Sequence, residues 1–361
     1  MYKKFFMGIA AMAALTLVSC SSDDLNSLSD NSSKNEAISF DGYLGRSAVA
    51  VNGSRGSELD KTALQGLTEG GFGVFGNYSE EGTADGYGKN WFDNQKVTFA
   101  SGAWTYEPLK YWLPQGHIDF LAYAPYDSQY DNNQVSKDNQ KLDFTVNSSI
   151  KDQKDLLWAN ATNKTKADKT VTFNFNHALA KIGYTVKTNV VGTGTTITLK
   201  KITLAGSTAA DPAKAFYTKG TIDLSKPNGR DLWTTPNPAE KQNFEWYKGT
   251  TYTVTTSASH PDDNREKDKD YLFVIPQNFE SGHDDLYVIV EYTINYNIGK
   301  PSTLKTMDYT VYSKIAKNFE QGKAYMINLT IGLTPIEFNA EVTPWTGEGN
   351  NETDIDIDSW N

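Results

Sequence analysis

The single cysteine of the chain, Cys20, stands where a thiol could be acylated. It is the only cysteine among 361 residues, and it ends the run Leu17-Val18-Ser19-Cys20. This run resembles a bacterial lipobox, in which a diacylglyceryl group is attached to the cysteine sulfur before the preceding residues are cleaved away. A lone cysteine cannot form an internal disulfide or supply a cysteine-based zinc or iron–sulfur site. The spacing therefore predicts lipidation of Cys20.

The residues before Cys20 have the composition of a secretory signal. Lys3 and Lys4 form a positive n-region, and an apolar stretch covers residues 5–18. A transmembrane helix needs about 20 apolar residues, so this stretch is too short to be one. Its length suits the h-region of a signal peptide. An ordinary secretory signal with a chance cysteine is the alternative. We expect residues 1–19 to be a lipoprotein signal peptide and residues 20–36 to be a flexible tether.

The other patterns with chemical potential are weak. Residues 71–76 match G-x-G-x-x-G, but no helix pattern follows, so a glycine-bearing strand is the better interpretation. The four histidines share no ligand spacing, and the alternating carboxylates of residues 354–358 lack the glycine and glutamate of an EF-hand. Recognisable hydrolase and P-loop motifs are absent, although glycosidase carboxylates could hide among 44 acidic residues. The sequence therefore predicts no enzyme, no cofactor and no metal.

The composition indicates a folded, acidic chain. It has 44 acidic and 34 basic residues, with a net charge of −10, which argues against nucleic acid as a partner. Aromatic residues make up 12%, which favours a packed core over disorder. At about 100–200 residues per domain, the length suggests two domains.

The elements expected to hold the candidate residues are strands. From residue 37 onward, apolar and polar side chains alternate in short runs that Gly, Asn, Asp and Pro separate. This pattern is typical of an all-β sandwich or barrel. Gly192-Thr193-Gly194 separates two strand-rich halves. We expect β-sandwich domains at residues 37–190 and 191–345, followed by an acidic C-terminal tail at residues 346–361.

Several segments, taken in order, resemble the fimbrillin-like proteins, the Mfa/FimA-type lipoprotein pilins of Bacteroidetes that build type V pili. The first ends in Trp112-Leu113-Pro114, and the last is Val342-Thr343-Pro344-Trp345. The segments are residues 104–114, 118–125, 155–159, 175–182, 273–277, 319–325 and 342–345. The resemblance covers the chain from the lipobox to the C-terminus. It implies two transthyretin-like β-sandwich domains in tandem and a lipid-anchored, surface-exposed location at the cell outer membrane, then in the fimbrium.

The resemblance also implies how subunits assemble. An arginine-specific protease removes the lipidated tail with the first strand, and a strand from the next subunit fills the opened groove. Arg46, in Gly45-Arg46-Ser47, is the first arginine of the chain and lies in a predicted turn. We expect cleavage between Arg46 and Ser47, with Arg55-Gly56 as the alternative site. A plain solvated turn residue is the other interpretation of Arg46.

Residues of this chain fit the strand exchange that the resemblance implies. The displaced first strand carries Ile38, Phe40 and Leu44. Two C-terminal stretches alternate apolar and polar residues, and each is a candidate donor that could instead stay within its own subunit. Their apolar residues are Ile336, Phe338, Ala340 and Val342 in the first stretch, and Ile355 and Ile357 in the second. The partners implied are copies of the chain or other pilin subunits, and a host or bacterial surface ligand.

Three rival functions remain open at this point. A tip adhesin would share the pilin fold with a stalk subunit, and the alternating C-terminal strands favour the stalk. A secreted hydrolase would need a constellation that the sequence does not reveal. A surface glycan-binding lipoprotein of a polysaccharide-uptake system would need exposed aromatic platforms. The tryptophans that could serve are Trp91, Trp104, Trp112, Trp233 and Trp246; Trp104 and Trp112 lie in strand-like runs and are expected to pack in the core.

Overall fold

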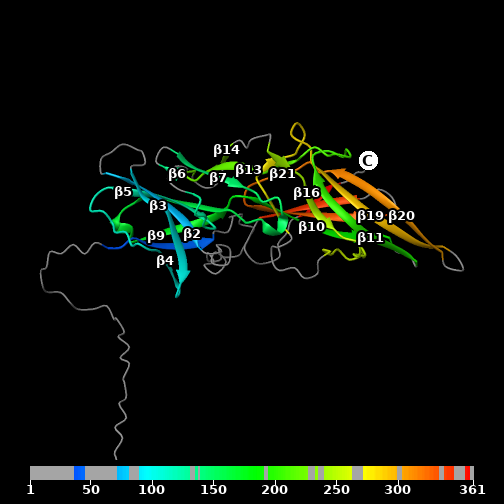
Figure 1. The fold of residues 1–361 in the computed structure, drawn as a ribbon, viewed down its shortest axis with the longest axis horizontal. Coiled ribbons are helices and arrows are strands. Elements are labelled where there is room, and N and C mark those ends of the chain that lie inside the picture. Colours follow the sequence, from blue (N-terminus) through cyan, green and yellow to red (C-terminus); the bar gives the residue numbers. More distant parts are fainter. Residues whose placement is uncertain are drawn as a thin grey trace, which may run out of the picture. The chain divides into compact units, whose positions relative to one another are not determined.

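The computed structural model describes residues 36–44, 71–80, 89–130, 135–136, 139–190, 194–226, 232–234, 240–261, 271–298, 303–332, 337–344 and 354–357. Several predicted site residues lie outside this part: Cys20, Arg46, Ser47, Arg55, Gly56 and Ile336. The described part consists of strands with two 3-10 turns, η1 (Ile150–Asp152) and η2 (Lys166–Asp168). This confirms the prediction of an all-β fold (Figure 1). Within these residues, no helix has the length and apolarity to span a membrane.

The N-terminal half is built on a seven-stranded sheet. Its strands, in spatial order, are β1 (Ser39–Leu44), β9 (Thr170–His177), β8 (Leu157–Lys164), β5 (His117–Ala124), β2 (Phe72–Ser79), β3 (Lys89–Ala100) and β4 (Ala103–Thr105). Neighbours are antiparallel, except that β1 runs parallel to β9. One face of this sheet carries an aromatic-rich core that includes both ends of the strand order, since residues of β1 and β4 belong to it.

The opposite face of that sheet meets a second layer. This four-stranded sheet has the order β14 (Trp233–Thr234), β13 (Lys219–Asp223), β7 (Asn139–Thr145) and β6 (Val135–Ser136). Phe75 and Leu121 of the large sheet join the same buried cluster as Leu142 of β7 and Ile222 of β13. The alternation of apolar residues along β2 and β5 thus serves two interiors, one on each face of the seven-stranded sheet.

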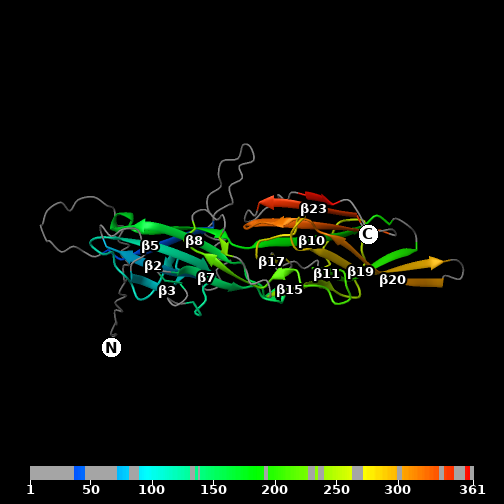
Figure 2. The same cartoon turned by 90° about the horizontal axis from the view of Figure 1, so that it is seen from above.

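The C-terminal half is a two-layer sandwich, and Figure 2 shows its two sheets stacked. One sheet has the order β17 (Leu272–Val274), β10 (Ala180–Thr188), β22 (Lys323–Ile331), β23 (Glu337–Pro344) and β24 (Asp354–Ile357). The other has the order β16 (Phe244–Lys248), β11 (Thr195–Ala205), β19 (Tyr287–Ile298) and β20 (Thr303–Lys314). Two short pairs complete it: β12 (Phe216–Tyr217) with β15 (Lys241–Gln242), and β18 (Gln277–Asn278) with β21 (Asn318–Phe319). The prediction of β-sandwich domains is confirmed.

Strand pairing crosses the expected division at residues 190 and 191. β10 precedes that point, yet it pairs with β22 and β17 of the C-terminal sheet. β13 follows it, yet it pairs with β7. The indole N–H of Trp233 also donates to the carbonyl oxygen of Ala178 at 2.7 Å. The chain thus changes sheets between β9 and β10, and the domain bounds given from the sequence remain a prediction.

Candidate functional site: strand β1 and its groove

β1 is a parallel strand that fills a groove in the N-terminal sheet. Its register with β9 runs from Ser39 opposite Thr170 to Leu44 opposite Phe175. Successive side chains of a strand point to opposite faces, so residues two positions apart share a face. Ile38 and Phe40 are buried, with 1% and 5% of their surfaces exposed, whereas Ser39 is exposed. Ile38 and Phe40, two of the three predicted side chains of the first strand, therefore point into the core, whereas the side chain of Leu44 lies outside the described part.

An aromatic pocket holds Phe40. Its ring centroid lies 5.2 Å from that of Tyr106, 5.4 Å from Phe92, 5.5 Å from Phe120 and 5.7 Å from Phe173. The contacts with Phe92 and Phe120 are edge-to-face, an arrangement that aromatic quadrupoles favour. These four partners come from β3, β5, β9 and the segment after β4. Phe40 thus links parts of the sheet that are far apart in the sequence.

The second edge of the first-strand segment is bonded to residues 106–112. Ile38 donates its backbone N–H to the carbonyl oxygen of Lys110 at 2.8 Å, and Trp112 donates its own to Glu36 at 3.0 Å. The hydroxyl of Tyr106 donates to the carbonyl oxygen of Ile38 at 2.7 Å. Burial raises the pKa of Tyr106, so its phenol stays protonated as a donor at neutral pH. Backbone bonds therefore hold this segment on both sides.

Lys110 fixes the segment that borders β1. Its ammonium donates to the carbonyl oxygen of Trp91 and lies 4.9 Å from the ring centroid of Phe92, in cation–π range. Burial lowers the pKa of Lys110, while the nearby Asp93 acts in the opposite direction. The segment is thus bonded to β3 as well as to the first strand. These contacts fix the position of this rim of the groove.

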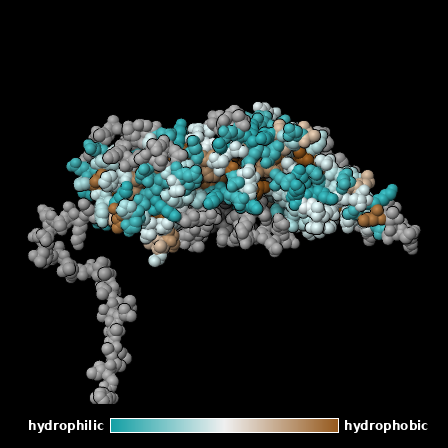
Figure 3. All heavy atoms as spheres, viewed as in Figure 1, coloured by the Kyte–Doolittle hydropathy of each residue, from teal (hydrophilic) through white to brown (hydrophobic). Residues whose placement is uncertain are grey.

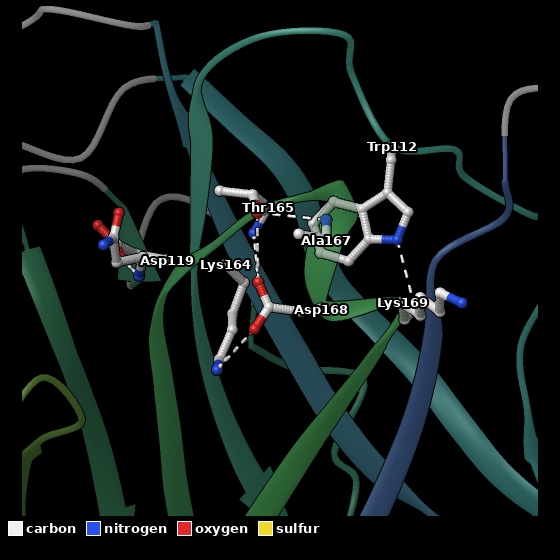
Figure 4. A network of polar contacts seen from close by, with 8 residues as sticks. Trp112, Asp119, Lys164, Thr165, Ala167, Asp168 and Lys169 are labelled. Carbon is white, nitrogen blue, oxygen red and sulfur yellow. Dashed lines mark hydrogen bonds and ion pairs between the residues drawn. The ribbon is translucent and has the colours of Figure 1, made fainter. Parts of the chain in front are cut away.

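The other rim begins at the turn before β9, where side chains form a compact network (Figure 4). Asp168 accepts the backbone N–H of Thr165 at 2.8 Å and pairs with the ammonium of Lys164 at 3.1 Å. These bonds lower the pKa of Asp168, and the hydrogen bond from the Thr165 N–H has the largest effect. Thr165 in turn accepts the N–H of Ala167 at 3.3 Å, which completes a capping box.

That turn presents one carbonyl oxygen to both the core and the first strand. The carbonyl of Lys169 accepts the indole N–H of Trp112 at 3.3 Å (Figure 4). It also accepts the hydroxyl of Ser39 at 3.4 Å. The hydroxyls of Ser39 and Thr170 are also 2.7 Å apart. The position of β1 along β9 is therefore set at its first residue, and a one-residue slip would expose Phe40.

The candidate donor stretches pair within their own sheet. β23 is antiparallel to β22, with Phe338 opposite Leu329 and Val342 opposite Tyr325. β24 is antiparallel to β23 at the end of the strand order, with Phe338 opposite Ile357. Both stretches are thus strands of one sheet, and donation to another subunit stays a prediction.

The tryptophans expected in the core are buried. Trp104 is 7% exposed and Trp112 is 5% exposed, and Trp246 is 8% exposed. Trp91 and Trp233 are half-buried. The tryptophans of the described part therefore offer no exposed platform for stacking on sugars. On the face that Figure 3 shows, hydrophilic side chains predominate and apolar ones form only small patches.

The titratable side chains give no sign of a metal centre in the part of the chain that the structure describes. No group of three or more His, Cys, Asp and Glu residues gathers there. His177 is buried at the end of β9, with its Nδ1 2.5 Å from the carboxylate of Asp155. This pair lies where the chain passes from β9 to β10, so we interpret it as part of the packing.

Sequence reasoning missed several residues that shape the groove. The alternation of apolar residues identified Ile38 and Phe40, but nothing in it pointed to Tyr106 or Lys110. Their contacts join positions 68 and 19 residues apart in sequence. The capping-box spacing of Thr165 and Asp168 was the one local signal available.

Comparison with known proteins gives a family and a fold. A family model described as fimbrillin-like matches residues 63–345. Among solved structures, a fimbrial protein from Bacteroides vulgatus is similar, with a TM-score of 0.62 and 22% identity over 86% of this chain and 100% of that one. A putative cell adhesion protein from Bacteroides ovatus has a TM-score of 0.53 and 16% identity over 87% and 99%. At such identities the likeness shows the fold alone. No curated protein matches the chain.

Proposed function

We propose, from the premise that the chain belongs to the fimbrillin-like family of Bacteroidetes fimbrial proteins, that it is a stalk subunit of a type V pilus. In this proposal the precursor is anchored in the cell outer membrane by a lipid on Cys20. An arginine-specific protease then cuts after Arg46, or after Arg55, and removes the first strand. Subunits join by donor-strand exchange, and the mature protein resides in the fimbrium.

The observation that carries the proposal is that β1 pairs with β9 and buries Phe40 in an aromatic pocket. β1 is a six-residue strand with a buried aromatic anchor, and residues 45–46 separate its last residue from the predicted cut. Removing it would leave the backbone groups of β9 unpaired on one edge and an apolar pocket open. Strand addition satisfies both, because main-chain hydrogen bonds supply affinity and alternate side chains supply register. A groove of this kind is otherwise an aggregation hazard, so covering it until cleavage is useful.

The alternative of a glycan-binding lipoprotein receives less support. It requires coplanar aromatic rings that face the solvent, and the described tryptophans are buried or half-buried. The large apolar side chains that are exposed in the described part are Leu109, Tyr111, Leu304 and Met307. One tyrosine among aliphatic side chains is a poor platform for sugar stacking. We therefore favour a subunit that binds other pilin subunits.

N-terminal sequencing of material sheared from the cell surface tests the proposal. We expect a start at Ser47, or at Gly56, and no material that begins at Cys20. Arg46→Ala should block the first cut and retain the lipidated precursor, and Arg55→Ala is the matched control. If Arg55→Ala alone retains the precursor, the second site is the one used. Polymers whose subunits all begin at Cys20 would refute maturation by cleavage.

A further inference from the structure

Two strand pairs of the described part are parallel, β1 with β9 and β10 with β22. The other pairs described there are antiparallel. β9 and β10 follow each other in the chain, with residues 178–179 between them. We infer that these two parallel pairs bear tension along the chain in series, each loaded in shear. The inference rests on the proposed function for the source of the force, which is a pull on a surface fibre.

Force reaches the β10–β22 pair at opposite ends of its two strands. A pull from the N-terminal side arrives at Ala180, the first residue of β10, because β9 leads into it. A pull from the C-terminal side arrives at Ile331, the last residue of β22. The strands point the same way, so these pulls draw them past each other lengthwise. All hydrogen bonds of the pair then carry the load together, whereas strands pulled from the same end separate one bond at a time.

β10 is the strand that holds β22 against such a pull. In its sheet β22 lies between β10 and β23. β23 follows β22 in the chain, and its last residue, Pro344, stands opposite Lys323 at the end of the sheet where β10 begins. A pull from beyond β23 therefore opens the antiparallel β22–β23 pair bond by bond. The load then passes to β22 and is resisted by β10.

Side-chain hydrogen bonds reinforce the loaded end of this pair. The hydroxyl of Thr188 donates to the carbonyl oxygen of Ile331 at 2.6 Å, across the last position of the register. The same hydroxyl accepts the backbone N–H of Val190 at 3.0 Å. The hydroxyl of Thr185 donates to the side-chain oxygen of Asn328, which stands opposite, at 2.7 Å. These bonds strengthen the end of β22 that the pull reaches first.

The interior of the C-terminal sandwich shields one face of the pair from water. Apolar side chains of both strands are buried in the core there: Ile182, Tyr184, Val186, Ile327, Leu329 and Ile331. Water has little access to take the place of a bond that breaks between such strands, so each broken bond leaves unpaired polar groups. The pair therefore resists sliding through its hydrogen bonds and its packing together.

The β1–β9 pair has the same design. A pull from the N-terminal side reaches Ser39, the first residue of β1, and leaves β9 at His177, its last residue. The hydroxyls of Ser39 and Thr170 are 2.7 Å apart, so this pair is also reinforced at its loaded end. In the uncut precursor the two pairs act one after the other. Removal of β1 would leave the β10–β22 pair intact, because both of its strands stay in the subunit.

Single-molecule force spectroscopy of the full chain tests the inference. The Cys20 thiol, kept free of lipid, is one handle, and the second is Asn361→Cys or Glu320→Cys. Glu320 is exposed and precedes β22, so a pull there reaches the N-terminal end of β22 and unzips the pair from β10. At one constant force, we expect the C-terminal sandwich to last at least about tenfold longer with the handle at residue 361, about 1.4 kcal/mol in the barrier. Forced unfolding reports the unfolding rate, which is the quantity compared.

A matched pair of variants tests the reinforcement. Thr188→Val removes the hydroxyl that bonds Ile331 and keeps the shape, and Thr310→Val makes the same change on β20, outside the pair. With the handle at residue 361, we expect Thr188→Val to shorten the lifetime at least about fivefold, about 1 kcal/mol for a hydrogen bond, and Thr310→Val to leave it unchanged.

The outcomes separate the inference from the proposed function. Equal lifetimes with the two handle positions overturn the shear loading, and equal effects of the two valine variants overturn the reinforcement by Thr188. Either result leaves the pilus subunit standing, because cleavage and polymer formation are measured separately. If Thr188→Val does not fold, the comparison of handles decides, since its two chains keep the β10–β22 pair unmodified.

Discussion

Replacing Phe40 by alanine should lower the free energy of unfolding of the N-terminal sandwich by about 3–5 kcal/mol. An aromatic side chain of this size buries about 150–250 Å², and Phe40 keeps 5% of its surface exposed. At about 25 cal/mol per Å², complete loss of that burial corresponds to roughly 4–6 kcal/mol. Alanine retains some of the area, whereas the cavity left among four rings adds to the loss.

Urea unfolding of the uncleaved precursor measures this effect. The fluorescence of Trp104 and Trp112 reports on the affected core, because both belong to the same buried cluster as Phe40. With a urea slope of about 1–3 kcal/mol per M, the midpoint should fall by at least about 1 M. Ser39→Ala is the matched control on the opposite face of β1, and as a surface change it should cost no more than about 0.5 kcal/mol.

The same substitution separates stability from assembly. If β1 is removed during maturation, polymers made from Phe40→Ala precursor should be as stable as those of the unmodified chain. A loss below about 1 kcal/mol in the precursor, equal to that of Ser39→Ala, would contradict the anchoring role given to Phe40. Weakened mature polymers would instead contradict removal of the strand.

Three further predictions concern the rims of the groove and the donor. Tyr106→Phe removes the hydrogen bond to the carbonyl of Ile38 and should cost about 1 kcal/mol in urea unfolding; no loss would mean that solvent replaces the bond. Asp168 has a lowered pKa, so its contribution is present above about pH 3.9 and is lost as the pH falls through its folded pKa. Asp168→Asn should therefore destabilise the precursor at pH 7, and the loss should shrink as the pH is lowered, in melting experiments across that range. Deleting residues 335–361 should leave secretion intact and abolish polymers, and normal pili from that truncation would refute C-terminal donation.

The fold class was accessible from the sequence because strand alternation is a local property. Ile38 and Phe40 stand two residues apart, so their shared face follows from the geometry of a strand. The partner of that face was not accessible: β1 pairs with β9, whose first residue is 131 positions away from Ser39. The transfer of β10 to the C-terminal sheet was equally hidden, since the sequence placed the division at Gly192-Thr193-Gly194, after β10, whereas the chain changes sheets before β10.

Under the proposed function, covalent connection would decide whether β1 or a donor strand occupies the groove. In the uncut precursor β1 is attached to the sheet that it fills, so it competes at an effective concentration in the millimolar range. A donor strand from another copy at micromolar concentration is then at a disadvantage of about a thousandfold, or about 4 kcal/mol. In the proposed assembly, cleavage after Arg46 would cancel that advantage, because the severed strand becomes a separate molecule. The cut itself would then set the direction of exchange.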